Sequence, residues 1–198
     1  MIIGLTGGIG SGKTTVAKFF SEFDNVVVYI ADLEAKKLMN SSVIIKDKLI
    51  KEFGEVSFVN QKINRKYISE IVFNDKQKLS VLNAIVHPEV KKHFQDFVEL
   101  NAHKAYIIYE NAILFESKSN LFCDFIITVY ADVKTKIERV ILRDSSTKED
   151  VKSRMNNQWN DFKKIVQSNY IIYNENLDET KNQVNKIHNI LTEKTYFI

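Results

Sequence analysis

The chain has 198 residues, and its 28 Lys and Arg against 25 Asp and Glu give a formal net charge of +3. Hydrophobic residues make up 44% and charged residues 27% of the chain, which supplies a sizeable core and excludes an intrinsically disordered protein. A charge this small, without clustered Lys or Arg, excludes a nucleic-acid coat and a polybasic membrane anchor, and no apolar run reaches the roughly 18 residues of a bilayer span.

Short apolar runs and segments with helical spacing alternate along the chain. The runs predict strands at residues 2–5, 26–30, 106–109 with a continuation toward Leu114, 125–130 and 170–173. Helical spacing predicts helices at residues 14–23, 66–73, 89–100, 134–143 and 179–191. Strands that are continuously apolar and separated by helices indicate a parallel sheet covered on both faces. The predicted fold class is therefore α/β, with three layers around a parallel five-stranded sheet.

The spacing of these elements predicts a single domain with two additions. With 1 Pro, 6 Gly and no repeat, the sequence shows no linker between independent domains. The gap between the second and third strands is far longer than a crossover helix needs, so an inserted helical lobe is expected at about residues 32–97. The polar stretch at about residues 138–167 is typical of a helical lid, although its charges also fit an ordinary solvated helix pair. The core then comprises about residues 1–31, 98–137 and 168–198.

The first strand leads into a glycine-rich motif. Residues 7–14, GGIGSGKT, match the pattern GxxxxGK[ST], and they follow a strand and open a helix, as a phosphate-binding P-loop does. The glycines let backbone N–H groups turn toward phosphate oxygens, and the helix N-terminus adds partial positive charge. Lys13 is expected to reach the β and γ phosphates and Thr14 to ligate Mg²⁺. The motif therefore predicts a P-loop fold and a nucleoside triphosphate site built from Gly8, Ile9, Gly10, Ser11, Gly12, Lys13, Thr14 and Thr15, against the alternative of a coincidental glycine-rich turn.

Two acidic residues follow apolar runs where open α/β sheets place their ligands. Asp32 comes directly after the second strand, where a carboxylate can accept a hydroxyl proton during phosphoryl transfer. It can equally cap the helix that follows. Glu110 ends the third strand, which suits either a carboxylate that holds Mg²⁺ through water opposite Thr14 or a surface or lobe-contacting residue.

Arginine is rare in this chain and gathers in one place. Three of the four Arg among its 28 basic residues lie in the polar stretch. Arg139 and Arg143 are four residues apart on one helix face, so they could close over a transferring phosphoryl group as arginine fingers supplied in cis. The alternative is that they form salt bridges with the neighbouring acids Glu138, Asp144 and Glu149.

A further candidate precedes the third strand. His87 and Pro88 are typical of a helix start, with Pro88 at the first helical position. His87 is then either a structural residue at the cap or a substrate contact.

The chain closely resembles the dephospho-coenzyme A kinase family, and the match extends nearly from end to end. The matching segments are residues 3–17, Ala31–Asp32, Asn64–Arg65, residues 71–73 and 82–88, Leu114–Phe115–Glu116, Arg139–Val140, Arg143–Asp144, Arg154 with Gln158, and Tyr170–Asn174. The resemblance implies that ATP, with Mg²⁺, phosphorylates the ribose 3′-hydroxyl of dephospho-coenzyme A in the last step of coenzyme A synthesis. Asp32 is then the base, and the inserted lobe holds the substrate.

The resemblance also implies roles for single residues. Lys13, Arg139 and Arg143 would join Asp32 in catalysis, and Asn174 would join the nucleotide site. The implied substrate contacts are Arg65, His87, Phe115 and Glu116. The sequence departs from the family pattern at three positions: Ile30 replaces an acid, Glu110 replaces an Asp and Ala112 replaces a Pro. None of these changes removes a group that the reaction requires.

Two other functions fit the motifs before the resemblance is considered. One is a small P-loop kinase that acts on a nucleoside monophosphate or a small alcohol, and the other is a non-enzymatic protein in which ATP drives a conformational change. A base candidate and clustered Arg count against the second, because a mere binder needs neither. Cys123 is the only cysteine, so an internal disulfide and a cysteine-based zinc site are excluded. We expect a cytoplasmic protein, a monomer or weak homo-oligomer, without nucleic-acid or membrane partners.

Overall fold

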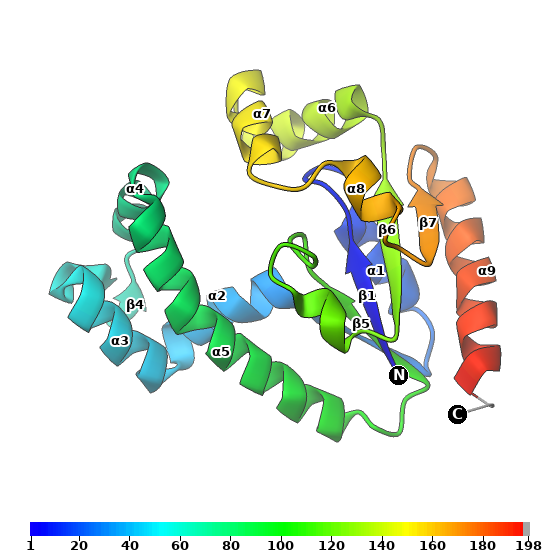
Figure 1. Ribbon diagram of the computed structural model, residues 1–198, viewed down its shortest axis with the longest axis horizontal. Helices are drawn as coiled ribbons and strands as arrows, with labels where there is room; N and C mark the ends of the chain where they lie inside the picture. The colour runs from blue at the N-terminus through cyan, green and yellow to red at the C-terminus, as the bar shows by residue number, and fades with distance from the viewer. Residues whose placement is uncertain (196–198) are drawn as a thin grey trace. The chain divides into compact units, whose positions relative to one another are not determined.

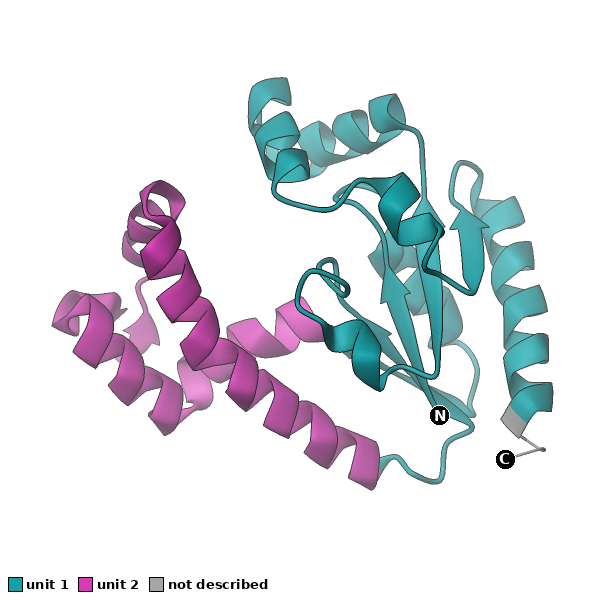
Figure 2. Cartoon of the chain, in the orientation of Figure 1, with its two compact units in different colours: residues 1–30, 101–198 teal, residues 31–100 magenta. Residues whose placement is uncertain are grey.

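The computed structural model describes residues 1–195 (Figure 1). The chain divides into two compact units, residues 1–30 with 101–198 and residues 31–100, and Figure 2 colours them separately. Within the described residues, no helix is long and apolar enough to cross a membrane. We describe each unit by itself and call them the core unit and the lobe unit.

The core unit is built on a parallel five-stranded sheet with the strand order β2-β5-β1-β6-β7. Its strands are β1 (Ile2–Thr6), β2 (Val26–Ile30), β5 (Tyr106–Glu110), β6 (Phe125–Tyr130) and β7 (Tyr170–Tyr173). Nearly every residue of β1 and β5 is buried, as expected of inner strands covered on both faces. The parallel five-stranded sheet predicted from the sequence is confirmed.

The strand register aligns the carboxyl ends of three strands. Leu5 of β1 lies opposite Glu110 of β5, and Glu110 in turn lies opposite Ile30 of β2. The segments that leave these three strands therefore start from the same edge of the sheet, which is where open α/β sheets place their ligands.

Helices and one irregular segment cover the sheet (Figure 1). The helices of the core unit are α1 (Lys13–Phe20), η2 (Ser119–Phe122), α6 (Val133–Asp144), α7 (Lys148–Asn156), α8 (Asp161–Ile165) and α9 (Leu177–Thr195). α1 and α9 cover one face, where Phe20 and Val184 belong to one buried cluster with Ile3. On the other face, a Cβ at Gly4 would lie 2.8 Å from the side chain of Leu114, so the segment after β5 packs directly on the sheet.

The predicted continuation of the third strand toward Leu114 is wrong, because β5 ends at Glu110. The backbone N–H of Asn111 still bonds to the carbonyl oxygen of Leu5 over 3.0 Å. The side chain of Asn111 then accepts a hydrogen bond from the N–H of Ile113 at 2.9 Å. This local hydrogen bond from the side chain to the backbone stabilises a turn after Asn111, so the strand does not continue.

The lobe unit consists mainly of helices and contains one small hairpin. Its elements are α2 (Ala31–Ser41), α3 (Val43–Phe53), η1 (Glu55–Ser57), β3 (Phe58–Val59), β4 (Lys62–Ile63), α4 (Arg65–Asn74) and α5 (Lys76–Leu100). The hairpin turns at Asn60 and Gln61, whose φ angles of 49° and 62° are left-handed. The sequence did not predict this hairpin, because its strands have two residues each and its turn has no glycine.

The predicted helix start at His87 and Pro88 is wrong. α5 begins at Lys76, where the carboxylate of Asp75 accepts hydrogen bonds from the backbone N–H groups of Gln77 and Lys78, and Pro88 lies inside the helix. An interior proline costs about 3 kcal/mol because it removes one N–H and crowds the carbonyl of the residue four positions earlier. That residue, Ala84, is exposed. Apolar residues buried on both sides of Pro88 then keep the helix continuous, namely Ile85, Val86, Val90 and Phe94.

Candidate active site

The loop between β1 and α1 curls tightly because glycine occupies positions that other residues avoid. Gly10 and Gly12 have φ angles of 80° and 89°. A Cβ at Gly10 would collide with the backbone oxygen of Lys136, and a Cβ at Gly12 would collide with the side-chain nitrogen of Asn174. Both the backbone conformation and the close neighbours therefore require glycine.

The interior of this loop carries polar groups that fit phosphate oxygens. Lys13 is buried, and its ammonium donates a hydrogen bond to the backbone oxygen of Gly8 over 3.3 Å. The hydroxyl groups of Thr6 and Ser11 are buried with no hydrogen-bond partner among the described residues. Buried hydroxyls normally have a hydrogen-bond partner, so these two are available to donate hydrogen bonds to phosphate oxygens.

Two predicted metal ligands lie near the carboxyl edge of the sheet. Thr14 is exposed on the first turn of α1, beside Thr15, and Glu110 is 4% exposed at the end of β5. Across residues 1–195, no three His, Cys, Asp or Glu side chains gather into a ready-made metal site. This donor set suits Mg²⁺, which keeps several waters and binds through one or two protein oxygens together with substrate phosphates.

Arg139 and Asn174 both lie against the loop. The side chain of Asn174 is buried, and its Nδ2 donates to the backbone oxygen of Ser11 at 2.8 Å. Nη2 of Arg139 donates to the backbone oxygen of Asn174 at 2.9 Å. Nη1 of Arg139 is buried without a partner in the described chain and lies 3.7 Å from the position of a Cβ on Gly12. A guanidinium donor is therefore free at the edge of the loop, close to where a bound anion would lie.

Arg143 occupies a different environment one turn further along α6. It is exposed and forms two hydrogen bonds with Asp144, of 2.7 and 3.0 Å, and Arg154 adds a third at 2.9 Å. The Arg143 hydrogen bond holds the pKa of Asp144 at about 2, and the pairing raises the pKa of Arg143. The structure thus contains the Asp144 salt bridge that the sequence left open as the alternative to an arginine finger.

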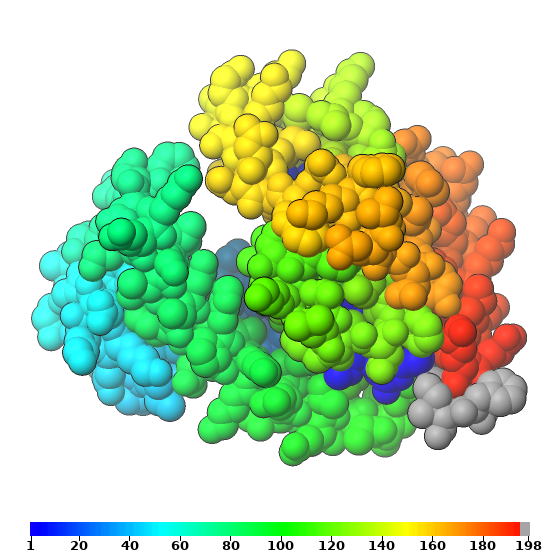
Figure 3. All heavy atoms as spheres, in the orientation of Figure 1, coloured from blue at the N-terminus to red at the C-terminus, as the bar shows by residue number. Residues whose placement is uncertain are grey.

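Phe115 and Glu116 contact the segment that joins α7 to α8. The rings of Phe115 and Trp159 stack with centroids 5.7 Å apart, so Trp159 packs against the segment after β5. Oε1 of Glu116 accepts from the backbone N–H of Trp159 at 2.7 Å and pairs with Lys164 at 3.1 Å, while Oε2 is buried without a partner among residues 1–195. Figure 3 shows the yellow-orange atoms of α8 resting on the green atoms of residues 111–124.

The other predicted site residues belong to the lobe unit. Asp32 is the second residue of α2, exposed in its first turn, so it is not the cap that precedes the helix. It follows Ile30, the last residue of β2, by two positions. His87 is exposed on α5, in the middle of the helix rather than at its start.

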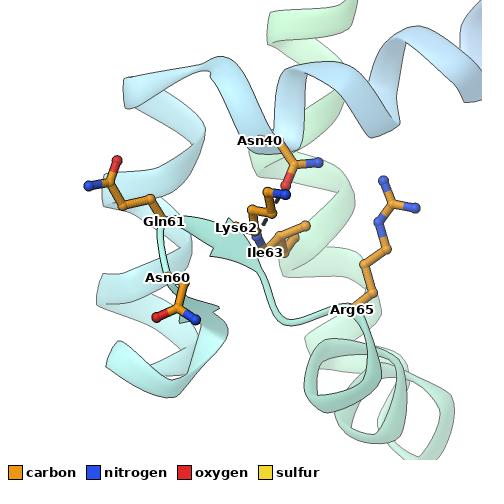
Figure 4. Close-up of a pocket in the computed structure, with 6 residues that line it drawn as sticks. All are labelled: Asn40, Asn60, Gln61, Lys62, Ile63 and Arg65. Carbon is orange, nitrogen blue, oxygen red and sulfur yellow. Dashed lines mark hydrogen bonds between the residues drawn. The ribbon is translucent and has the colours of Figure 1, made fainter.

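Arg65 begins α4 and lines a groove of about 850 Å³ (Figure 4). The groove lies within the lobe unit and is lined by Asn40, Asn60, Gln61, Lys62, Ile63 and Arg65. Oδ1 of Asn40 accepts from the backbone N–H of Ile63 at 3.1 Å, the bond drawn as a dashed line in Figure 4. Within the described chain, neither Lys62 nor Arg65 forms an ion pair with an acidic side chain.

Two buried lysines near the loop escaped the sequence prediction. Lys136 is buried on α6, where it forms an ion pair with Asp161, and Lys164 is fully buried and donates to the backbone oxygen of Ala112 at 2.6 Å. Burial lowers the pKa of Lys164. The burial of Lys136 could have been predicted, because this lysine lies on the same helix face of α6 as the buried residues Ile137 and Val140. No pattern marked Lys164, because its partners come from a distant segment.

Comparisons with known proteins agree over nearly the whole chain. A family model described as dephospho-CoA kinase matches residues 1–179. A dephospho-CoA kinase of Leptospira interrogans is 37% identical over 195 residues, which cover 98% of this chain and 94% of that relative. The crystal structure of TT1252 from Thermus thermophilus superposes with a TM-score of 0.84 at 27% identity, over 98% of this chain and 97% of that chain. A dephospho-CoA kinase of Campylobacter jejuni, 22% identical over 97% of both chains with a TM-score of 0.64, shares the fold.

Proposed function

Because the chain belongs to the dephospho-CoA kinase family, we propose that it transfers the γ-phosphoryl group of ATP to the ribose 3′-hydroxyl of dephospho-CoA, giving CoA and ADP. The observation that carries this proposal is the loop itself. It carries the buried ammonium of Lys13 and the unpartnered hydroxyl of Ser11, with the unpartnered hydroxyl of Thr6 just before it and the unpartnered Nη1 of Arg139 beside Gly12. Such a set of donors suits phosphoryl transfer, because enzymes catalyse this reaction mostly by positioning the reactants and by stabilising negative charge on the transferring group.

Lys13 and Arg139 act on the phosphate side of the reaction. Lys13 exchanges its bond with the Gly8 carbonyl for phosphate oxygens, and Arg139 keeps one nitrogen on Asn174 while the other donates to the phosphates. Thr14 and Glu110 hold Mg²⁺, which when bound neutralises phosphate charge. Arg143 joins this group as the second lid arginine once it exchanges Asp144 for phosphate.

Asp32 acts on the acceptor side as the general base. A carboxylate accepts the proton of the attacking hydroxyl as the phosphoryl group moves. Asp32 is exposed and follows β2 by two residues, and β2 ends level with Glu110 at the ligand-binding edge of the sheet. These features support a base, since the carboxylate is solvated, accessible and attached to the correct strand end.

The groove beside Arg65 suits the remainder of dephospho-CoA. That molecule carries a diphosphate and a chain with two amide groups. Lys62 and Arg65 supply unpaired cations for phosphate oxygens, and the amide side chains around them offer both donors and acceptors. Arg65→Ala should raise the KM for dephospho-CoA about tenfold and leave the KM for ATP unchanged. His87, Phe115 and Glu116 stay predicted contacts on this acceptor side, the last two through the segment after β5.

We place this reaction in the cytoplasm, in a monomer or weak homo-oligomer. The single cysteine supports a reducing compartment, because Cys123 is half-buried and its pKa is raised to about 12 by burial and by the charge of Asp124. A thiol of that kind is neither a nucleophile nor a ready disulfide partner.

The proposal is tested by incubating the purified protein with Mg-ATP and dephospho-CoA. Mass spectrometry should find one added phosphate, and NMR of the product should place it on the ribose 3′ position. ATP hydrolysis without transfer would instead favour the nucleotide-driven binding protein, and transfer to another hydroxyl would contradict the assigned site.

A further inference from the structure

The peptide bond between Gly8 and Ile9 is held from both of its ends. The carbonyl oxygen of Gly8 accepts hydrogen bonds from Nζ of Lys13 at 3.3 Å and from the backbone N–H of Ser11 at 3.1 Å. The N–H of Ile9 donates to Oε1 of Gln158 at 2.9 Å. Because a peptide unit is planar, its oxygen and its N–H rotate together. A rotation that frees Gln158 therefore also moves the atom to which Lys13 bonds.

Gln158 reaches Ile9 from a segment that is fixed on both sides. The backbone N–H of Trp159 bonds to Glu116, which also pairs with the fully buried Lys164. Two residues beyond Trp159, Asp161 forms its ion pair with the buried Lys136. Each of these anchors buries a charged group with a partner of opposite charge, so releasing the segment would leave an unpaired charge in the interior. Gln158 is therefore held in place by two charged pairs, one of which, Lys136 with Asp161, also lies against Gly8 and Gly10 of the loop.

The side chain of Ile9 makes a second, separate attachment. It packs against the small apolar cluster where α6 meets α7, formed by Ile137, Val140 and Val151 with Ile141 and Met155. The other residues of the loop next to Ile9 are glycines, which have no side chain to pack and which raise the conformational entropy of the loop. Ile9 is thus the position at which the lid can restrain an otherwise permissive backbone.

We propose that Gln158 is a positioning residue for ATP binding, which fixes the Gly8–Ile9 peptide and through it the starting position of Lys13. Its amide oxygen accepts a hydrogen bond from the N–H of Ile9 and so fixes the orientation of the peptide before ATP binds. The loop then loses less conformational entropy when the nucleotide binds. The inference rests on the proposed function only in that the ligand of the loop is ATP.

The test uses one isosteric variant and one matched control in the full-length protein. Gln158→Met keeps the length of the side chain and removes its amide oxygen. Gln167→Met makes the same exchange just beyond α8, where the side-chain amide of the glutamine donates to the backbone oxygen of Lys163 at 3.3 Å. We expect Gln158→Met to weaken ATP binding about three- to tenfold by calorimetry, to leave the Kd for dephospho-CoA unchanged and to leave the control like wild type.

Hydrogen exchange at the Ile9 amide tests separately whether the Gln158 side chain holds this peptide, and the selective change in the Kd for ATP distinguishes positioning from a purely structural role. Exchange should accelerate in Gln158→Met and stay slow in Gln158→Glu, which retains an acceptor oxygen. The inference is overturned if Gln158→Met binds ATP like wild type, or if both substrates weaken together with a fall in Tm. A wild-type protein that binds ATP but forms no CoA would contradict the proposed function and leave this comparison of ATP affinities intact.

Discussion

The side-chain amide of Asn174 donates a hydrogen bond to the backbone oxygen of Ser11 over 2.8 Å, although 163 positions separate the two residues. The other end of the amide accepts from the hydroxyl of Thr180 at 3.0 Å, and the backbone oxygen of Asn174 accepts from Arg139. One buried residue after β7 therefore connects the glycine-rich loop, Arg139 of α6 and α9.

Asn174→Ala should weaken both the site and the fold. Removing the amide leaves the carbonyl of Ser11 and the hydroxyl of Thr180 with fewer partners, at a cost of about 1–3 kcal/mol in the free energy of unfolding. The KM for ATP should rise about tenfold, because the loop loses its support. Thr180→Val is the matched control, since it keeps the bond to Ser11. Urea unfolding and steady-state kinetics should show lower stability in both variants and a raised KM only in the first.

Lys13→Ala should abolish turnover. The ammonium is the buried cation of the loop, and its loss removes charge stabilisation worth about 10³-fold or more. Lys18→Ala, on the exposed side of the same helix, should leave the rate of CoA formation unchanged. Retained phosphorylation in Lys13→Ala would refute the role of the loop as a phosphate cradle.

Asp32→Asn should lower kcat by about 10²-fold or more with little change in ATP affinity, because it removes proton acceptance and keeps the shape of the side chain. Glu34→Gln removes a carboxylate from the same helix turn, one that pairs with Lys37 on the surface, and should have almost no effect. Near-normal turnover in Asp32→Asn would contradict the role as a base and would leave Asp32 only a structural role, as an acidic residue that stabilises the first turn of α2.

Arg143→Ala should lower turnover by about 10²-fold or more if the arginine leaves Asp144 to reach the phosphates. Asp144→Asn breaks the same surface pair while keeping the guanidinium, so it separates the two roles of Arg143. Equal and small effects of both variants, confined to thermal stability, would show that the salt bridge is the whole role of Arg143.

The pair also predicts a pH dependence of stability. The pKa of Asp144 is about 2 in the folded protein, below its ordinary value of 3.8, chiefly because of the hydrogen bond from Arg143. A carboxyl group with a depressed folded pKa stabilises the fold fully above its unfolded pKa and loses this contribution as pH falls through the folded value. Between about pH 4 and about pH 2, urea unfolding of Asp144→Asn should therefore lose less stability than wild type. Parallel curves for the two proteins would contradict the pairing.

The sequence predicted those features that depend on local pattern. Continuous apolar runs placed all five strands of the sheet, and the glycine spacing placed Lys13 at the start of α1. The family resemblance and the three comparisons agree on the fold.

The features that failed depend on contacts between distant segments. Pro88 lies inside α5 because apolar residues on both sides of it are buried, and a local rule about proline does not include that burial. Arg139 and Arg143 are equivalent in their spacing, yet it is Arg139 that donates to Asn174, a residue 35 positions further along the chain. Gln158 belongs to the segments that match the family pattern, but neither that match nor its spacing showed that it supports Ile9, 149 positions away.

The most direct test of the central claim is a competition among acceptors. Purified protein receives Mg-ATP together with equal amounts of dephospho-CoA, AMP, CMP, shikimate and adenosine, and mass spectrometry scores a phosphate on each, with Lys13→Ala as the blank. We predict that CoA is the single phosphorylated product and that the blank forms none. Phosphorylation of another acceptor in preference to dephospho-CoA would contradict the account.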